Sequence, residues 1–366
     1  MAFCLDIMLV ELGKDIAEDA IKGNAIALQV LRYLLMAHRN GKHLVFFGHS
    51  VASMLTSSDL PDEIIRGCYS IAKHTTSLGS LVGSISVKLV ISQNTYTPAP
   101  SQRVILLNPY KNGAFEIYEE THLLTENLLD AEFYLALVAY YKRKARLKSK
   151  EVNFFPLQGG GDTISVMMEK EMKLRQHLCL AISDSDIKYQ GGPKGGTYKN
   201  IVEVMRKGSA DFCGLYCMEH VREVENLIPY QFIRSNSNYK NRKLIKEDFD
   251  FDMSYYDMKD GIGVKSLSDT SFVAYWRTTL AVHHKEFSKL IKKEVLATGK
   301  KRKRKTTSSD KILEGFGSKL MDTVFTKSQN ELMRVDDELL TPAQQTEWYN
   351  IGKQVFDWCC AGKRSN

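Results

Sequence analysis

Residues 177–186, HLCLAISDSD, hold the pattern that decides the fold. The apolar run from His177 to Ser183 does not alternate with polar residues, which predicts a strand buried on both faces in the middle of a parallel sheet. Asp184 and Asp186 follow this strand directly. Because ligands collect beyond the carboxyl ends of the strands in open parallel α/β sheets, the two acids are placed where a functional site is expected.

The segments before this strand alternate between strand and helix patterns. In order, the predicted elements are strands at 104–108 and 115–124, a helix at 128–146, a strand at 152–157, a tight glycine turn at 159–161 and a helix at 162–176. Strands that alternate with helices are typical of a doubly wound α/β layer. The sequence therefore predicts an α/β fold with a central parallel sheet.

The flanking regions differ in pattern from this central layer. Apolar spacing predicts a helix at 14–38 and a short strand at 43–47. After Gly196 the pattern predicts helices within 207–228, 270–296 and 309–357, with a basic loop at 299–310. We therefore expect three regions: an N-terminal α/β region (1–100), a central catalytic domain (101–230) and a mainly helical C-terminal region (231–366).

The composition is that of a globular protein without a membrane span, a signal peptide or a disulfide framework. The chain has 366 residues, of which 43% are hydrophobic and 25% charged, as in ordinary globular proteins. No uncharged apolar stretch reaches the roughly 18 residues of a membrane span, and the N-terminus lacks the basic start of a signal peptide. The seven cysteines of the chain show no disulfide framework, which favours a location in the reducing cytoplasm. A net charge of +7 suits a polyanionic partner such as nucleic acid.

A second group of acids follows another predicted strand. Glu126 lies at the carboxyl end of the strand predicted at 115–124, and Asp130 lies one turn into the next helix. Carboxylate oxygens are ligands for Mg²⁺ or Mn²⁺, which can neutralise a scissile phosphate and activate water. Glu126, Asp130, Asp184 and Asp186 are therefore the candidate metal ligands. Glu126 is the candidate for proton transfer to the leaving oxygen. The alternative is ordinary, because acids at strand ends also cap helices or face solvent.

The combined pattern resembles a known family. Glu126, a glycine at 160 or 161, and the D-x-D of Asp184 and Asp186 resemble the Toprim domain of topoisomerases, bacterial primases and a group of nucleases. Asp130 matches the nuclease branch, such as the overcoming-lysogenization-defect nucleases. Two positions depart from the family pattern, since Asn127 replaces a usual glycine and Lys188 stands where topoisomerases carry a third Asp. The resemblance covers roughly residues 104–230.

The resemblance implies a Rossmannoid sheet and a Mg²⁺- or Mn²⁺-dependent endonuclease that cleaves DNA or RNA, including tRNA. It also implies that Glu225, with Glu223 as second choice, joins the metal ligands and that Lys259 stabilises phosphate charge. Related stand-alone nucleases serve in bacterial defence against phage, commonly with a separate ATPase or sensor protein. Ordinary surface roles for Glu225 and Lys259 stay open.

Basic residues predict where nucleic acid would bind. Lys188 and Lys194 lie in a glycine-rich loop after the D-x-D, where backbone N–H groups and lysines can hold phosphate. A denser basic run contains Lys300, Lys301, Arg302, Lys303 and Arg304. Such a run contacts the nucleic-acid backbone without reading sequence, although a solvated loop or a nuclear localisation signal has the same composition.

Three rival interpretations stay open. The chain could be a non-catalytic nucleic-acid-binding module whose acids hold a structural metal. FFGHSVA at 46–52 is similar to the nucleophile elbow of serine hydrolases, with Ser50 as nucleophile. Cys213, Cys217 and His220 would share one face of a helix and could hold zinc, although core packing is the commoner role of such cysteines.

Overall fold

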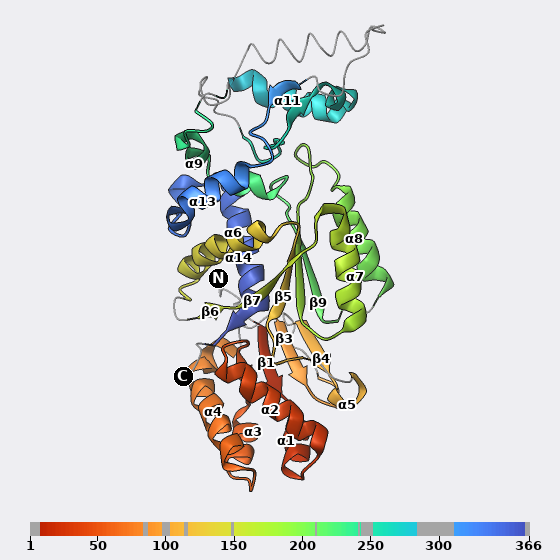
Figure 1. The fold of residues 1–366 in the computed structure, drawn as a ribbon, viewed down its shortest axis with the longest axis vertical. Coiled ribbons are helices and arrows are strands. Elements are labelled where there is room, and N and C mark those ends of the chain that lie inside the picture. The colour runs from red at the N-terminus through yellow and green to blue at the C-terminus, as the bar shows by residue number, and fades with distance from the viewer. Residues whose placement is uncertain are drawn as a thin grey trace.

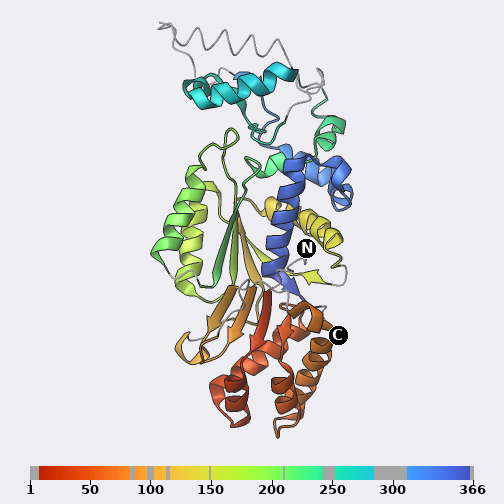
Figure 2. The ribbon, with the colours of Figure 1, turned by 180° about the vertical axis from the view of Figure 1, so that it is seen from behind.

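The computed structural model describes residues 8–82, 87–96, 103–112, 116–147, 150–208, 211–240, 242, 252–283 and 311–362. The protein is an α/β protein with two four-stranded parallel sheets, ordered β2-β1-β3-β4 and β7-β5-β8-β9. The molecule is elongated, with the first sheet at one end, the second in the middle and helix α11 (Thr270–His283) at the other end (Figures 1 and 2). Across the described ranges, no helix has the length and apolar character needed to cross a bilayer.

The N-terminal unit contains the first sheet. Its elements are β1 (Met8–Leu12), α1 (Lys14–Ile21), α2 (Ala25–Arg39), β2 (Val45–Phe46), α3 (His49–Thr56), α4 (Asp62–Val82), β3 (Val87–Ile91), β4 (Arg103–Leu107) and α5 (Pro109–Asn112). The single helix predicted at 14–38 is wrong, because the chain breaks after α1. Gly23 adopts a φ of 83°, and the Asn24 side chain caps α2 by accepting from Ile26 N and Ala27 N.

The strand predicted at 104–108 belongs to this first sheet. As β4, it pairs in parallel with β3, and Leu89 lies opposite Ile105. The expected start of the central domain at residue 101 therefore falls before the last strand of the first sheet.

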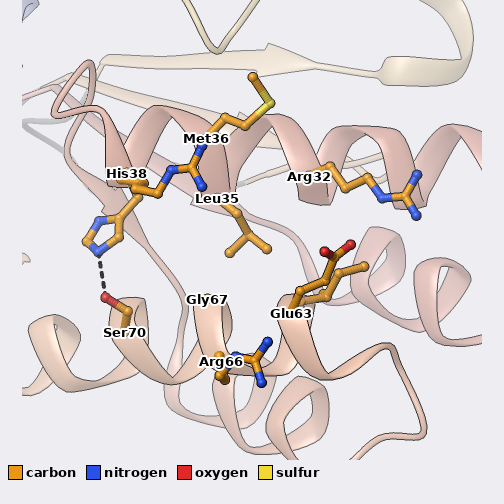
Figure 3. Close-up of a pocket in the computed structure, with 10 residues that line it drawn as sticks. Arg32, Leu35, Met36, His38, Glu63, Arg66, Gly67 and Ser70 are labelled. Carbon is orange, nitrogen blue, oxygen red and sulfur yellow. Dashed lines mark hydrogen bonds between the residues drawn. The ribbon is translucent and has the colours of Figure 1, made fainter. Parts of the chain in front are cut away.

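A cavity of about 640 Å³ lies between α2 and α4 (Figure 3). Arg32, Arg39 and Arg66 line it together with His38, whose Nε2 lies 3.2 Å from Ser70 Oγ. The two helices approach closely at Gly67, where an added Cβ would lie 2.9 Å from Leu35 Cδ2. This cavity is far along the chain from the predicted carboxylate site.

The central unit contains the second sheet. Its elements are β5 (Thr121–Thr125), α6 (Leu128–Lys144), β6 (Glu151–Val152), β7 (Phe154–Gln158), η1 (Gly161–Thr163), α7 (Ile164–Leu174), β8 (Cys179–Ser183), α8 (Gly196–Lys207), β9 (Cys213–Cys217) and η2 (Val224–Leu227). Helices α7 and α8 cover one face of the sheet, and α6 with α14 (Pro342–Cys359) covers the other (Figures 1 and 2).

Two predictions in this unit need correction. The strand predicted at 115–124 is shorter, because residues 116–120 form a turn and bend before β5 begins at Thr121. The helix predicted within 207–228 is wrong, since α8 ends at Lys207 and residues Cys213–Cys217 form the edge strand β9. A short apolar run of this length fits a strand, which sequence periodicity alone does not separate from a helical segment.

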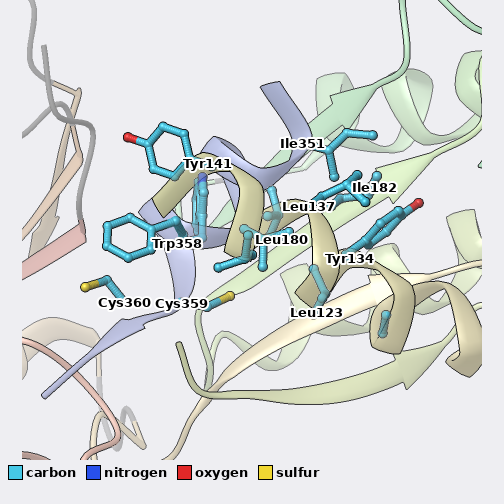
Figure 4. Close-up of a cluster of buried hydrophobic side chains, with 14 of the residues drawn as sticks. Leu123, Tyr134, Leu137, Tyr141, Leu180, Ile182, Ile351, Trp358, Cys359 and Cys360 are labelled. Atoms are coloured by element: carbon cyan, nitrogen blue, oxygen red, sulfur yellow. The ribbon is translucent and has the colours of Figure 1, made fainter. Parts of the chain in front are cut away.

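Helix α14 returns from the C-terminal region to the central core. It packs along α6, and Gly352 allows the contact, because an added Cβ would lie 2.2 Å from Leu137 O. Strand β12 (Cys360–Ala361) then pairs with β6. Figure 4 shows the resulting core, in which α6, α14 and the sheet contribute Leu123, Tyr134, Leu137, Tyr141, Leu180, Ile182, Ile351 and Trp358.

Most of the remaining elements lie beyond the carboxyl end of the central sheet, whereas α13 (Leu320–Leu332) and η4 (Asp337–Leu339) pack against α6 (Figures 1 and 2). The others are α9 (Tyr230–Ser235), β10 (Gly261–Gly263), η3 (Val264–Ser268), α11 (Thr270–His283) and β11 (Lys311–Glu314). The region expected to be mainly helical thus also contains an antiparallel β10–β11 pair. The helix predicted at 270–296 is described only as far as His283.

Candidate metal centre

Acidic residues follow the two neighbouring strands at the middle of the central sheet. Strand β5 ends at Thr125 and is followed by Glu126, whereas β8 ends at Ser183 and is followed by Asp184. The strands pair in parallel, with Leu124 opposite Ala181. Their carboxyl ends therefore meet at one edge of the sheet, as the sequence predicted.

Three carboxylates come together at this edge. Asp184, Glu223 and Glu225 each offer an oxygen atom, and these oxygens all lie within 4.8 Å of one another. All three side chains are buried. Glu225 was the preferred downstream acid from the sequence and Glu223 only the second choice, but the structure brings both to Asp184.

Backbone hydrogen bonds fix the positions of these carboxylates. Asp184 Oδ1 accepts from Val224 N at 3.0 Å, and Glu223 Oε1 accepts from Met258 N at 2.9 Å. The side-chain amide of Asn226 donates to Met253 O and Tyr256 O. The segment around η2 is therefore tied both to the end of β8 and to the segment that carries Lys259.

Lys259 supplies positive charge to the cluster. Its Nζ lies 3.0 Å from Glu225 Oε2 and 3.5 Å from Glu223 Oε2. Burial alone would lower the pKa of Lys259, but the charges of Glu223, Glu225 and Asp184 raise it above its usual value. One ammonium thus faces three carboxylates, and the cluster keeps an excess of acidic groups.

Burial and the excess of acidic groups raise the pKa values of Asp184 and Glu223. Burial, followed by the neighbouring Glu126 and Glu225, raises the pKa of Asp184 well above its usual range. Burial and the charge of Glu225 raise the pKa of Glu223 to about 7. A second positive charge placed among these oxygens would favour the ionised carboxylates.

Asp130 has a capping role and lies beside the three converging carboxylates. Its Oδ2 accepts from Asn127 N at 3.0 Å, which completes a capping box at the start of α6. The same side chain is buried, and its pKa is raised to about 7 by burial and then by Glu225. Glu126 contributes to the raised pKa of both Asp130 and Asp184, which places it in the same electrostatic environment.

Asp186 is not one of the three converging carboxylates. It adopts a left-handed backbone with a φ of 54°, and its N–H donates to Arg222 O at 2.9 Å. Gly195 makes room for its side chain, because a Cβ at that glycine would lie 2.3 Å from Asp186 Oδ2. The D-S-D turn is therefore held between residue 222 and the start of α8.

Helix α14 supports the loop between β9 and η2. The buried carboxylate of Glu347 accepts from Glu219 N, His220 N and the hydroxyl of Tyr216, at 2.6, 2.7 and 2.7 Å. Trp348 Nε1 donates to Leu227 O at 2.8 Å. Residues more than 120 positions apart form this support, so no local sequence pattern indicates it.

The ligand chemistry of the cluster fits a hard divalent cation. The three converging groups are all carboxylates, and Mg²⁺ and Mn²⁺ prefer oxygen ligands. The buried acids with raised pKa values are stabilised in their ionised form by such a charge. Asp184, Glu223 and Glu225 are therefore the residues that would hold the ion, with Asp130 and Glu126 beside them.

Of the predicted nucleic-acid-binding residues, Lys188 and Lys194 belong to the part of the chain that the structure describes. Lys188 is exposed, whereas the Nζ of Lys194 lies 3.6 Å from Glu219 Oε1 and 4.4 Å from the centre of the Tyr198 ring. The basic run of Lys300, Lys301, Arg302, Lys303 and Arg304 lies outside the described residues.

Two rival sites do not match the geometry that they require. Ser50 is an ordinary residue in the first turn of α3, and it is not among the described non-glycine residues with positive φ, unlike the strained serine of a nucleophile elbow. Cys213 and Cys217 are buried on strand β9 while His220 is exposed beyond it, so the predicted shared helical face is wrong.

Comparisons of the chain with protein-family models, curated proteins and solved structures found no match. The site geometry and the sequence pattern therefore carry the functional argument.

Proposed function

We propose that the chain is a metal-dependent nuclease of the Toprim type, which hydrolyses phosphodiester bonds of DNA or RNA. The convergence of Asp184, Glu223, Glu225 and Lys259 at the carboxyl edge of the central parallel sheet carries this proposal. Glu126 and Asp130 add acidic charge at the same edge. A buried oxygen-rich cluster with one lysine suits a reaction in which phosphate charge must be neutralised.

The chain's own residues have distinct roles in the proposal. Bound Mg²⁺ or Mn²⁺ supplies charge neutralisation at the phosphate and a water of lowered pKa. Asp184, Glu223 and Glu225 hold the ion, and Glu126 passes a proton to the leaving oxygen. Lys259, whose side chain is about one-third exposed, offers its ammonium to the phosphate.

The partners follow from the same proposal. Nucleic acid is the substrate, in keeping with a net charge of +7, and Lys188 and Lys194 follow the D-x-D on the chain. A separate ATPase or sensor protein would control the activity in bacterial defence against phage in the cytoplasm. These biological assignments rest on the Toprim resemblance rather than on the site geometry.

Cleavage assays test the proposal. The purified chain is incubated with plasmid, single-stranded DNA or tRNA, in Mg²⁺, Mn²⁺ or EDTA. We expect metal-dependent cleavage that falls at least about 100-fold in Glu126→Gln and in Asp184→Asn. Glu132→Gln, which changes an exposed acid on α6, is the matched control. Cleavage unchanged in both site variants contradicts the proposal. Metal binding without cleavage of any substrate favours the non-catalytic binding module.

A further inference from the structure

A second group of metal-ligating side chains lies at the opposite edge of the central sheet. His122 is the second residue of β5, Glu171 lies in α7, and His177 precedes β8. Each residue offers one ligand atom, and these three atoms all lie within 4.8 Å of one another. This group contains two imidazoles, unlike the all-carboxylate centre.

The two imidazoles are held by carboxylates. Their rings stack with centroids 4.0 Å apart and planes at 21°. His122 Nδ1 lies 2.9 Å from Glu171 Oε2, and His177 Nε2 lies 3.1 Å from Glu116 Oε2. His122, Glu171 and His177 thus form one compact cluster, and Glu116 contacts it through His177. The exposed fractions of the His122 and His177 side chains are only 14% and 16%.

The cluster opens into a cavity that gives access from solvent. The cavity has a volume of about 240 Å³, and both histidines and Glu116 line it with Glu119, Glu120 and Phe155. Lys42 pairs with Glu119 and Glu120, but neither Glu116 nor Glu171 has a lysine or arginine partner among the described ion pairs. The wall is therefore rich in acidic and imidazole groups.

The cluster is separate from the carboxylate centre. His122 lies near the amino end of β5, whereas Glu126 follows its carboxyl end. Four residues of extended strand span about 13 Å. Ligands at one edge of the sheet do not reach an ion at the other edge.

We propose that His122, Glu171 and His177 bind a divalent transition metal, for which Zn²⁺ is the best fit, and that Glu116 orients the His177 ring beside them. Zinc takes imidazole nitrogen and carboxylate oxygen in four-coordinate sites, whereas Mg²⁺ prefers oxygen alone. The ion would tie α7 to the starts of β5 and β8. This site is independent of the proposed nuclease activity.

Metal binding to the full, untagged chain tests the proposal in excess Mg²⁺. We expect one equivalent of Co²⁺ to give the intense visible absorption of a low-coordinate site, and Zn²⁺ to displace it. The band is expected to disappear in His122→Gln and His177→Gln. It is expected to persist in Asp184→Asn and in His220→Gln, which changes an exposed histidine outside the cluster. A chain without the band, or a band unchanged in both cluster variants, overturns the proposal.

Two further measurements test zinc binding at this cluster if a histidine variant fails to fold. Glu116→Gln alters a side chain that is 35% exposed, and we expect it to weaken Zn²⁺ binding by at least about tenfold. X-ray absorption of the zinc-loaded wild-type chain is expected to show imidazole scattering. Coordination by oxygen alone would show that the two histidine–glutamate pairs are ordinary hydrogen bonds and not a metal site.

Discussion

The ammonium of Lys259 lies 3.0 Å from Glu225 Oε2, inside a group of buried carboxylates. A metal ion bound by the same acids would compete with this lysine for one set of negative charges, and metal binding would thereby free the ammonium to interact with a phosphate.

This competition gives a prediction for Lys259→Met. We expect cleavage to fall by about 100- to 1,000-fold, because a preorganised charge at the phosphate is lost. Affinity for Mg²⁺ or Mn²⁺, measured by calorimetry, is expected to stay the same or increase. Lys265→Met, which changes an exposed lysine in η3, is the control. Loss of metal binding in Lys259→Met would show that the lysine only maintains the fold of the cluster.

The raised pKa values predict a pH-dependent effect of metal on stability. Burial and Glu225 raise the pKa of both Asp130 and Glu223 to about 7, above the value near 4 of the unfolded chain. The folded state thus holds more protons, and the stability contributed by these protonated groups is present below pH 4 and lost as the pH rises through about 7.

Metal binding reverses this loss because it favours the ionised carboxylates. We expect Mg²⁺ or Mn²⁺ to raise Tm more at pH 8 than at pH 5.5. At a metal concentration 100 times Kd, binding adds about 2.7 kcal/mol to the free energy of unfolding. Thermal unfolding with metal and with EDTA measures the difference. An equal rise in Tm at both pH values, or the same rise in Asp184→Asn, would contradict the prediction.

Gly195 predicts a steric requirement at the D-S-D turn. In Gly195→Ala, the new Cβ would lie 2.3 Å from Asp186 Oδ2, so Asp186 or the start of α8 must shift. We expect a loss of about 1–3 kcal/mol in stability and a parallel loss of cleavage. Gly196→Ala is the matched control, since no atom lies within 4 Å of its added Cβ. Equal stabilities of the two variants by denaturant unfolding would refute this requirement.

Glu347 predicts a long-range effect on the metal centre. In Glu347→Gln, one of the two carboxylate oxygens becomes an amide that cannot accept from the backbone N–H groups or from Tyr216. We expect a loss of about 1–3 kcal/mol and weaker metal binding, because the loop before η2 loosens. Glu338→Gln, at an exposed position of η4, is the control. Unchanged metal affinity would confine Glu347 to a purely structural role.

Local patterns predicted the parts of the fold that depend on neighbouring residues. The apolar run of β8 and the helix α6, which was predicted at 128–146, are both encoded within a few positions. The edge strand β9 was misread as helix because Cys213–Cys217 is too short to show a period. The assignment of β4 to the first sheet depends on pairing with β3, which local sequence does not specify.

In the candidate sites, too, local sequence indicates some residues and tertiary packing brings the others together. Glu126 and Asp184 could be placed because each follows a recognisable strand. The cluster of His122, Glu171 and His177 has no spacing of its own, since it forms only when β5 pairs with β8 and α7 packs against the sheet. The approach of both Glu223 and Glu225 to Asp184 likewise depends on the turn into η2.

The packing of α14 on α6 has a consequence for synthesis. Strand β9 ends at Cys217 and α14 begins at Pro342, so more than 100 residues separate the finished sheet from its last covering helix. At about 5–20 residues per second, the ribosome needs on the order of ten seconds to supply that helix. During this interval the apolar side of α6 is exposed to solvent. We therefore expect nascent chains to bind chaperones at this stage and to complete the central core only when α14 packs on α6.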